Sequence, residues 1–153
     1  MRIVLFQLII ISTLLTSNMA LGQGLERQKH YISIGFLDHK TGNSLVGYAR
    51  SLFQNKNNEI YIGGGTFIAS NTLLIGLKKY IFRSFVDGYS TFSIQKIYGM
   101  GGGVNAAGIS IGVEKKVWKV LFLNMGFNTI IDPGTIVNQN LVGFPTLSLN
   151  ISF

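Results

Sequence analysis

The residues with the clearest chemical capacity lie in one short polar stretch. Asp38, His39 and Ser44 supply a carboxylate, an imidazole and a hydroxyl, which are the groups that an acyl-transferring site combines. The same stretch holds Gly42 and Asn43 and has the composition of a turn. A solvated loop is therefore the simpler interpretation, and the sequence predicts no catalytic site here.

The two histidines of the chain are expected to lie too far apart to cooperate. His30 stands nine positions before His39. An extended chain rises about 3.3 Å per residue, which separates the two imidazoles by roughly 30 Å. They cannot then share a metal ion or a proton relay. Because the chain has no cysteine, disulfides and thiolate metal sites are excluded as well, and no cofactor or metal is predicted.

Two glycine-rich stretches, 63–65 and 99–103, have the composition of phosphate-binding loops but not their pattern. Neither contains the spacing G-x-G-x-x-G, neither precedes a helix, and no P-loop lysine follows. Glycines also let strands curve and approach one another closely, or form bulges and turns. We expect that steric role for both stretches.

The composition indicates a chain that is partly solvated by something other than water. Of its 153 residues, 47% are hydrophobic and only 12% are charged, about half the charged share of a typical soluble domain. No internal run of about 18 apolar residues is present to make a membrane-spanning helix. High apolarity without such a run favours a membrane-spanning β-barrel, in which alternating strands dilute the hydrophobic signal.

The last strand carries the strongest pattern. Large apolar residues from Leu147 to Phe153 alternate with Thr146, Ser148, Asn150 and Ser152, which gives a ribbon with one apolar and one polar face. A strand that ends on a large apolar residue fits poorly at the open edge of a soluble sheet. It fits well if it closes a barrel by pairing with the first strand.

Eight strands of about 9–12 residues are predicted after residue 29, the length that a tilted strand needs to cross a bilayer. Alternation is clean in the first strand and in the last four, whereas the second to fourth are ambiguous. Arg50, in the second, is expected to point into the lumen. The predicted strands cover residues 30–38, 44–54, 59–69, 72–82, 88–98, 104–113, 117–128 and 144–153.

An even number of strands places both chain ends on one side, and the connections then alternate between the two ends of the barrel. Short turns at 55–58 and 114–116 are predicted at the end of the chain termini, which is taken as the periplasmic side. The longest connection, about 129–143, is predicted at the opposite, outer end.

The pattern assigns a face to each side chain. Polar and small residues are expected to fill a lumen just wide enough for side chains, so that the lumen is plugged rather than conducting. These are Ser33, Gly35, Thr91, Ser93, Gln95, Ser110, Asn124, Thr146, Ser148, Asn150 and Ser152, with Tyr31 and Phe122 as fillers. The residues expected to face the membrane are Ile32, Ile34, Phe36, Ile109, Ile111, Leu121, Leu123, Leu147, Leu149 and Ile151.

Residues 1–22 have the pattern of a cleavable signal peptide. Arg2 precedes a mostly apolar run over residues 3–11, and the small residues Ala20 and Gly22 occupy positions −3 and −1 of a cut after Gly22. A retained membrane helix is the alternative, but the run is short and is interrupted by Gln7. Residues 23–29 form a polar lead-in, and the predicted barrel domain spans 30–153.

With these features the chain resembles the small eight-stranded bacterial outer-membrane β-barrel proteins. The resemblance covers nearly all of the chain after the signal peptide and implies an all-β, antiparallel, up-and-down transmembrane barrel in the outer membrane. It implies that Phe153 is a signal read by the barrel-assembly machinery, and that outer-membrane lipids are partners. The short outer loops depart from the better-known members and argue against an adhesin built on long loops.

The basic residues are distributed unequally along the predicted barrel. We expect them to gather at the periplasmic end, where each gains on the order of 1 kcal/mol beside an anionic leaflet. Ordinary solvated turn lysines are the alternative. Trp118 and Tyr80 would belong to an aromatic girdle at this end, and Lys40 and Lys96 would lie towards the outside. The predicted basic collar consists of Lys56, Lys78, Lys79, Arg83, Lys115, Lys116 and Lys119.

The function predicted from these patterns is that of a non-enzymatic, structural or surface-interacting outer-membrane barrel. A net charge of +7 would also suit nucleic acid, but a signal peptide and a membrane-facing surface argue against it. A soluble lipocalin-like barrel with an apolar ligand is one alternative. A lipid A-modifying acyl enzyme is another, although the His-x-Ser-Asn pattern of the lipid A deacylases is absent. Oligomeric state stays open.

Overall fold

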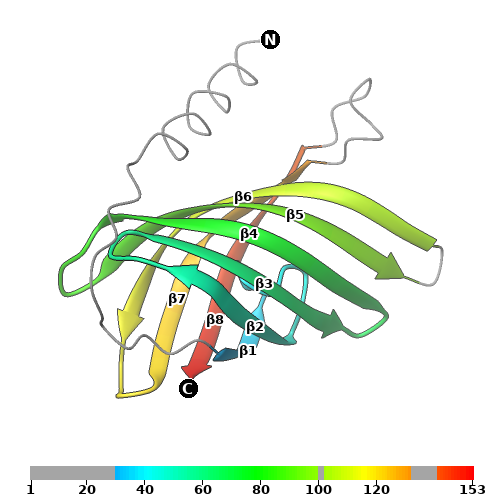
Figure 1. Ribbon diagram of the computed structural model, residues 1–153. Helices are drawn as coiled ribbons and strands as arrows, with labels where there is room; N and C mark the ends of the chain where they lie inside the picture. Colours follow the sequence, from blue (N-terminus) through cyan, green and yellow to red (C-terminus); the bar gives the residue numbers. More distant parts are fainter. Residues whose placement is uncertain (1–29, 100–101, 132–140) are drawn as a thin grey trace, which may run out of the picture.

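The computed structural model describes residues 30–99, 102–131 and 141–153. The predicted signal peptide and lead-in, 1–22 and 23–29, lie outside the described residues. Eight antiparallel strands close into a barrel in which each strand pairs with its sequence neighbours and β1 pairs with β8 (Figure 1). They are β1 His30–Phe36, β2 Val46–Gln54, β3 Asn58–Phe67, β4 Ser70–Phe82, β5 Asp87–Gly99, β6 Gly102–Lys116, β7 Leu121–Ile131 and β8 Leu141–Ser152. The predicted all-β, eight-stranded antiparallel barrel is confirmed.

The seam between the first and last strands is closed at the chain termini. The His30 amide donates a hydrogen bond to the Phe153 carbonyl at 3.1 Å, and the Phe153 amide donates to the His30 carbonyl at 3.0 Å. The two rings stack with centroids 5.7 Å apart. The alternating strand at the end of the chain therefore closes the barrel, as its pattern predicts.

Several strand boundaries differ from the prediction: β7 covers Leu121–Ile131 rather than 117–128, and β8 begins at Leu141 rather than at 144. Two of the differences have a clear physical reason. β6 continues through the stretch 114–116, which was expected to be a turn, because its alternation carries Glu114 into the lumen, where it meets polar partners. The turn lies instead at 117–120, where the amide of Trp118 donates to the carbonyl of Leu121 at 3.2 Å. β1 ends at Phe36, two residues early, because the chain then turns inward.

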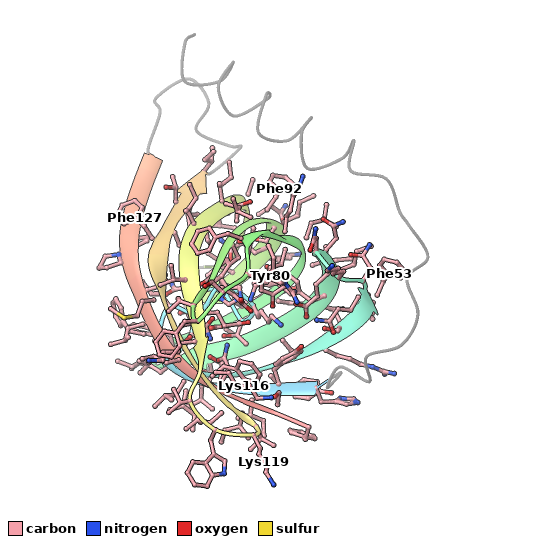
Figure 2. The ribbon with its side chains drawn as sticks, turned by 90° about the vertical axis from the view of Figure 1, so that its left-hand side faces the viewer. Phe53, Tyr80, Phe92, Lys116, Lys119 and Phe127 are labelled. Atoms are coloured by element: carbon pink, nitrogen blue, oxygen red, sulfur yellow. The ribbon has the colours of Figure 1, made fainter. Side chains whose placement is uncertain are left out.

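The outer surface of the barrel is apolar, and the ten residues predicted to face a membrane lie on it. Seven of them are 37–58% exposed, namely Ile32, Ile34, Phe36, Ile111, Leu147, Leu149 and Ile151, whereas Ile109, Leu121 and Leu123 are half-buried on the same face. Figure 2 shows Phe53 and Phe127 pointing away from the barrel and Tyr80 lying within it.

The inner surface is polar, and the ten buried hydroxyl and amide side chains predicted to line it do so, from Ser33 to Ser152. One prediction about this face is wrong. Arg50 is exposed on the outside, because its neighbours Ala49 and Ser51 are the inward residues of β2. The ambiguous β2–β4 region thus alternates over most of its length, with a register shift between Ser51 and Phe53 in β2 and another between Tyr80 and Phe82 in β4. Short glycine stretches and apolar residues on both faces conceal this alternation in the sequence.

Large aromatic side chains fill part of the lumen because facing glycines leave room for them. A Cβ atom on Gly76 would lie 2.5 Å from the ring of Tyr61, and Tyr61 is fully buried. We expect Gly76→Val to lower the free energy of unfolding by about 1–3 kcal/mol through overpacking. Gly99→Val is the matched control, since only one atom, 3.9 Å away, approaches a Cβ there. Urea unfolding followed by the fluorescence of Trp118 measures both, and equal effects would contradict the steric account.

Candidate functional site: a polar segment inside the barrel

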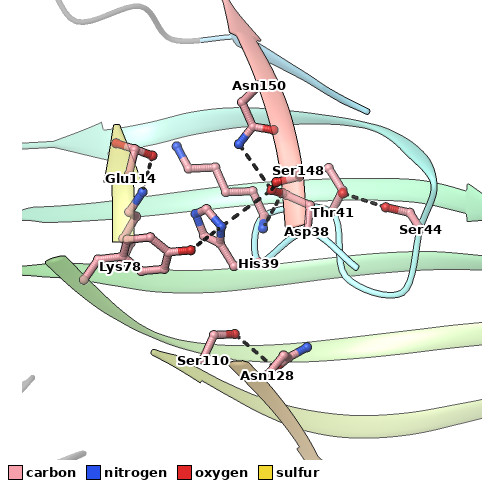
Figure 3. Close-up of polar contacts among 12 residues, drawn as sticks. Asp38, His39, Thr41, Ser44, Lys78, Ser110, Glu114, Asn128, Ser148 and Asn150 are labelled. Carbon is pink, nitrogen blue, oxygen red and sulfur yellow. Dashed lines mark hydrogen bonds and ion pairs between the residues drawn. The ribbon is translucent and has the colours of Figure 1, made fainter. Parts of the chain in front are cut away.

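The connection between β1 and β2 lies inside the barrel rather than outside it. We call residues 37–45 the inserted segment. Leu37, Asp38, His39, Lys40, Thr41 and Ser44 are only 0–4% exposed. Figure 3 shows Asp38, His39, Thr41 and Ser44 lying among the strands. The expectation that Asp38, His39 and Ser44 occupy a solvated loop, with Lys40 towards the outside, is therefore wrong.

The backbone of the inserted segment forms a compact loop with its own hydrogen bonds. The Gly42 amide donates to the Asp38 carbonyl at 2.7 Å, and the Lys40 amide donates to the Asp38 side chain at 2.8 Å. Gly42 has φ +74° and Leu37 has φ +57°. A positive φ is easy for glycine but strained for leucine. The turn-like composition was thus interpreted correctly, but the direction of the turn was not.

Asp38 anchors the inserted segment to the polar face of β8. Its carboxylate accepts hydrogen bonds from the Ser148 hydroxyl and, at 3.2 Å, from the Asn150 amide (Figure 3). Both donors belong to the alternating series that lines the lumen. The buried carboxylate is therefore held by neutral donors, which offsets the cost of removing it from water.

Lys40 anchors the inserted segment to the opposite wall. Its ammonium group lies 2.7 Å from the Glu59 carboxylate on β3 and 3.4 Å from the centre of the Tyr31 ring. The Ser51 hydroxyl on β2 donates a further hydrogen bond to Glu59. Because both charges are buried, each loses its hydration and is stabilised instead by the opposite charge of its partner.

His39 lies in the middle of the lumen against an aromatic ring. Its Nδ1 atom is 3.2 Å from the Tyr89 hydroxyl and 3.6 Å from the Asp38 carboxylate. Its backbone carbonyl accepts a hydrogen bond from Tyr61 at 2.9 Å. Burial, and then the nearby charge of Lys78, lower the pKa of the imidazole well below its usual value. The imidazole is therefore neutral at pH 7, in the form that packs against the Tyr89 ring.

A second buried ion pair lies beside the inserted segment. Lys78 on β4 is 2.7 Å from Glu114 on β6, and the Tyr80 hydroxyl donates to the same carboxylate at 3.0 Å. The side chains of Lys78 and Tyr80 are both buried in the lumen. Lys78 therefore does not belong to the basic collar predicted at the periplasmic end, and Tyr80 does not belong to the aromatic girdle predicted there. The exposed positions Leu73 and Ile75 place the even-numbered residues of β4 inside.

The inserted segment packs directly against three glycines of β2 and β3, namely Gly47, Gly63 and Gly65. A Cβ atom on Gly63 would overlap the Lys40 carbonyl oxygen, and one on Gly47 or Gly65 would lie 2.5 Å from the Cβ of Thr41 or Ser44. The glycines at 63 and 65 therefore have the predicted steric role. The partner they accommodate is a loop, which the sequence analysis did not foresee.

The three candidate catalytic side chains are held in buried contacts inside the lumen. The Ser44 hydroxyl is hydrogen-bonded to Thr41 at 2.6 Å, while His39 faces Tyr89. The three candidate catalytic side chains are each at most 3% exposed, so a substrate could not reach them without displacing the segment. Within the described ranges, no group of three or more His, Asp and Glu side chains is placed to hold a metal ion.

Comparison with protein-family models, with curated proteins and with solved structures gave no significant match. Among the described residues, no helix has both the length and the apolarity needed to cross a membrane.

The ion pair between Lys40 and Glu59 gives a direct test of how the inserted segment is held. Glu59→Gln leaves a buried ammonium group without its counterion, so we expect a loss of about 3–5 kcal/mol in the free energy of unfolding. Adding Lys40→Met to the same protein should recover most of the loss, because neither charge then remains. Urea unfolding of the single and double variants measures the coupling, and additive losses would contradict a direct pair.

Proposed function

We propose that the protein is an integral β-barrel of the bacterial outer membrane, structural or surface-interacting and without enzymatic activity, whose lumen is closed by the inserted segment. The observation that carries this proposal is the polarity of the two faces. Large apolar side chains cover the outside, whereas buried charges and hydroxyls occupy the inside. This is the reverse of a water-soluble barrel.

The cost of leaving the outer face in water supports a lipid environment. Leu52, Leu73, Ile94, Met125 and Phe127 are each 52–58% exposed and come from four different strands. Fully burying one such side chain is worth about 1.5–3 kcal/mol. Soluble monomers rarely expose continuous apolar areas of more than a few hundred Å². Acyl chains would cover this belt without any further protein.

The contents of the lumen argue against a lipocalin-like carrier. Such a barrel needs an apolar interior with room for a ligand. Here the interior holds the inserted segment together with the ion pairs of Lys40 and Lys78. An apolar ligand would have to displace paired charges. The burial of Asp38, His39 and Ser44 argues in the same way against a lipid A-modifying enzyme.

Membrane fractionation combined with heat-modifiability tests the proposal. We expect the protein in the outer-membrane fraction, extractable only with detergent, and its migration in a denaturing gel to change on boiling. Recovery in the soluble periplasm would favour the carrier. A changed lipid A profile on overexpression would favour the enzyme.

The depth of an introduced charge distinguishes a lipid-facing belt from a water-facing one. Ile94 lies in the middle of β5 and Val117 lies in a turn, and their side chains are 58% and 53% exposed. In a bilayer we expect Ile94→Lys to cost about 2–4 kcal/mol and Val117→Lys about 0–1 kcal/mol. Unfolding from lipid vesicles measures both. Equal tolerance of the two lysines would indicate that water covers both positions.

Displacing the inserted segment should open the lumen. Gly63→Val forces a side chain into the space of the Lys40 carbonyl. In Gly64→Val, on the same strand, the side chain points to the outer face, where its Cβ meets the Thr72 carbonyl oxygen at 2.9 Å but not the inserted segment. In planar bilayers we expect steady ion conductance from the Gly63 variant, and little from the wild type or the Gly64 variant. A wild-type protein that conducts as well as the Gly63 variant would show that the segment does not seal the barrel.

A further inference from the structure

We propose that the end of the barrel at the chain termini binds the headgroups of anionic glycerophospholipids. The inference rests on the proposed function, since it requires a bilayer around the barrel, and it adds the class of lipid and the residues that select it. We call the binding surface the basic rim. It consists of Lys56, Arg83, Lys115, Lys116 and Lys119.

The basic rim gathers residues from separate parts of the chain at one end of the barrel. The connections 55–57, 83–86 and 117–120 all lie at the end where His30 meets Phe153. Each rim residue is in one of these connections or among the last residues of an adjoining strand (Figure 2 labels Lys116 and Lys119). Towards the opposite end, the described residues contain one exposed cation, Lys96, which is in register with Leu73 and Asn105.

The folding of the lumen makes this end more basic than the composition alone would. The chain has 6 Asp and Glu residues against 13 Lys and Arg. Glu59 lies near the start of β3 and Glu114 near the end of β6, both close to the basic rim, but their carboxylates turn inward and pair with Lys40 and Lys78. Asp87, in register with Glu114, is the remaining acid at this end within the described ranges. The two buried ion pairs thus leave this end of the barrel with more cations than carboxylates on its outer surface.

Aromatic and apolar side chains stand among these cations. Phe85 and Trp118, in two of the connections, are 79% and 71% exposed. The Lys115 ammonium group lies 4.0 Å from the centre of the Phe85 ring. Aromatic rings beside lysines are characteristic of the layer between acyl chains and headgroups, where the ring contacts the chains and the ammonium group reaches the phosphate.

The combination selects the partner. A soluble acidic protein or a nucleic acid would meet the positive charge but would leave Phe85 and Trp118 in water. An anionic lipid layer meets both the charges and the rings. Because the proposed barrel has its termini on the periplasmic side, the adjoining leaflet is made of glycerophospholipids rather than of lipid A.

The experiment compares lipids around the folded barrel. The full protein is reconstituted into vesicles of phosphatidylcholine, alone or with added phosphatidylglycerol, and the binding of spin-labelled phosphatidylglycerol and phosphatidylcholine gives their relative association constant. We expect a clear preference for phosphatidylglycerol. Lys119→Gln should reduce it by up to about fivefold, and 1 M salt should abolish most of it because charges are then screened beyond roughly 3 Å. Lys96→Gln, the matched control at the other end, should leave it unchanged.

The outcomes separate the two proposals. A barrel that inserts into both kinds of vesicle but binds the two labelled lipids equally would overturn the lipid preference and leave the proposed function intact. Equal losses from the Lys119 and Lys96 variants would also overturn it, because the preference would then follow total charge. If added lipid A displaces phosphatidylglycerol and its binding depends on Lys119, the assignment to glycerophospholipid is wrong. Failure to insert into any vesicle would overturn the proposed function and this inference with it.

Discussion

The structure depends on two buried ion pairs, because the lumen is too narrow for water to solvate the charges inside it. Lys40 and Glu59 meet at 2.7 Å, as do Lys78 and Glu114, and aromatic rings cover both ammonium groups. Each pair joins segments that are distant in the chain. Removing one member would leave an uncompensated charge. The Lys40–Glu59 pair thereby fixes where the inserted segment lies, and the Lys78–Glu114 pair joins β4 to β6 beside it. A uniformly apolar lumen would leave the position of a loop within it undefined.

Space inside the barrel is divided between side chains and backbone. Where β2 and β3 carry inward-facing glycines, the backbone of the inserted segment fills the volume. Where β4 and β6 carry Gly76 and Gly112, the rings of Tyr61 and Tyr89 fill it. At both places the missing side chain of glycine leaves room in the lumen for a bulky group, either the inserted segment or a tyrosine ring. Dense packing in so small a lumen leaves little freedom for substitution.

The two faces of the barrel support a single proposal from opposite directions. Outside, apolar side chains from all eight strands have no protein cover. Inside, Glu59 and Glu114 form ion pairs and Asp38 accepts hydrogen bonds. The cations of the basic rim are therefore the main charges on the outer surface at the end where the chain termini meet. The interior and the membrane-facing surface are thus linked, because a carboxylate turned inward is one that cannot neutralise a rim lysine.

The sequence by itself determined the strands, their number and, for the first and the last four, their faces. Alternation is a local property with a period of two, so residues such as Leu147 to Ser152 specify it without any partner. The tertiary structure decided what the polar residues do. A turn of Asp38, His39 and Lys40 is equally polar inside or outside a barrel. Its direction depends on Glu59, Ser148 and three glycines from other strands. For Lys78 the alternation of β4 was present but concealed by leucines on both faces, and only the closed barrel brings its counterion within reach.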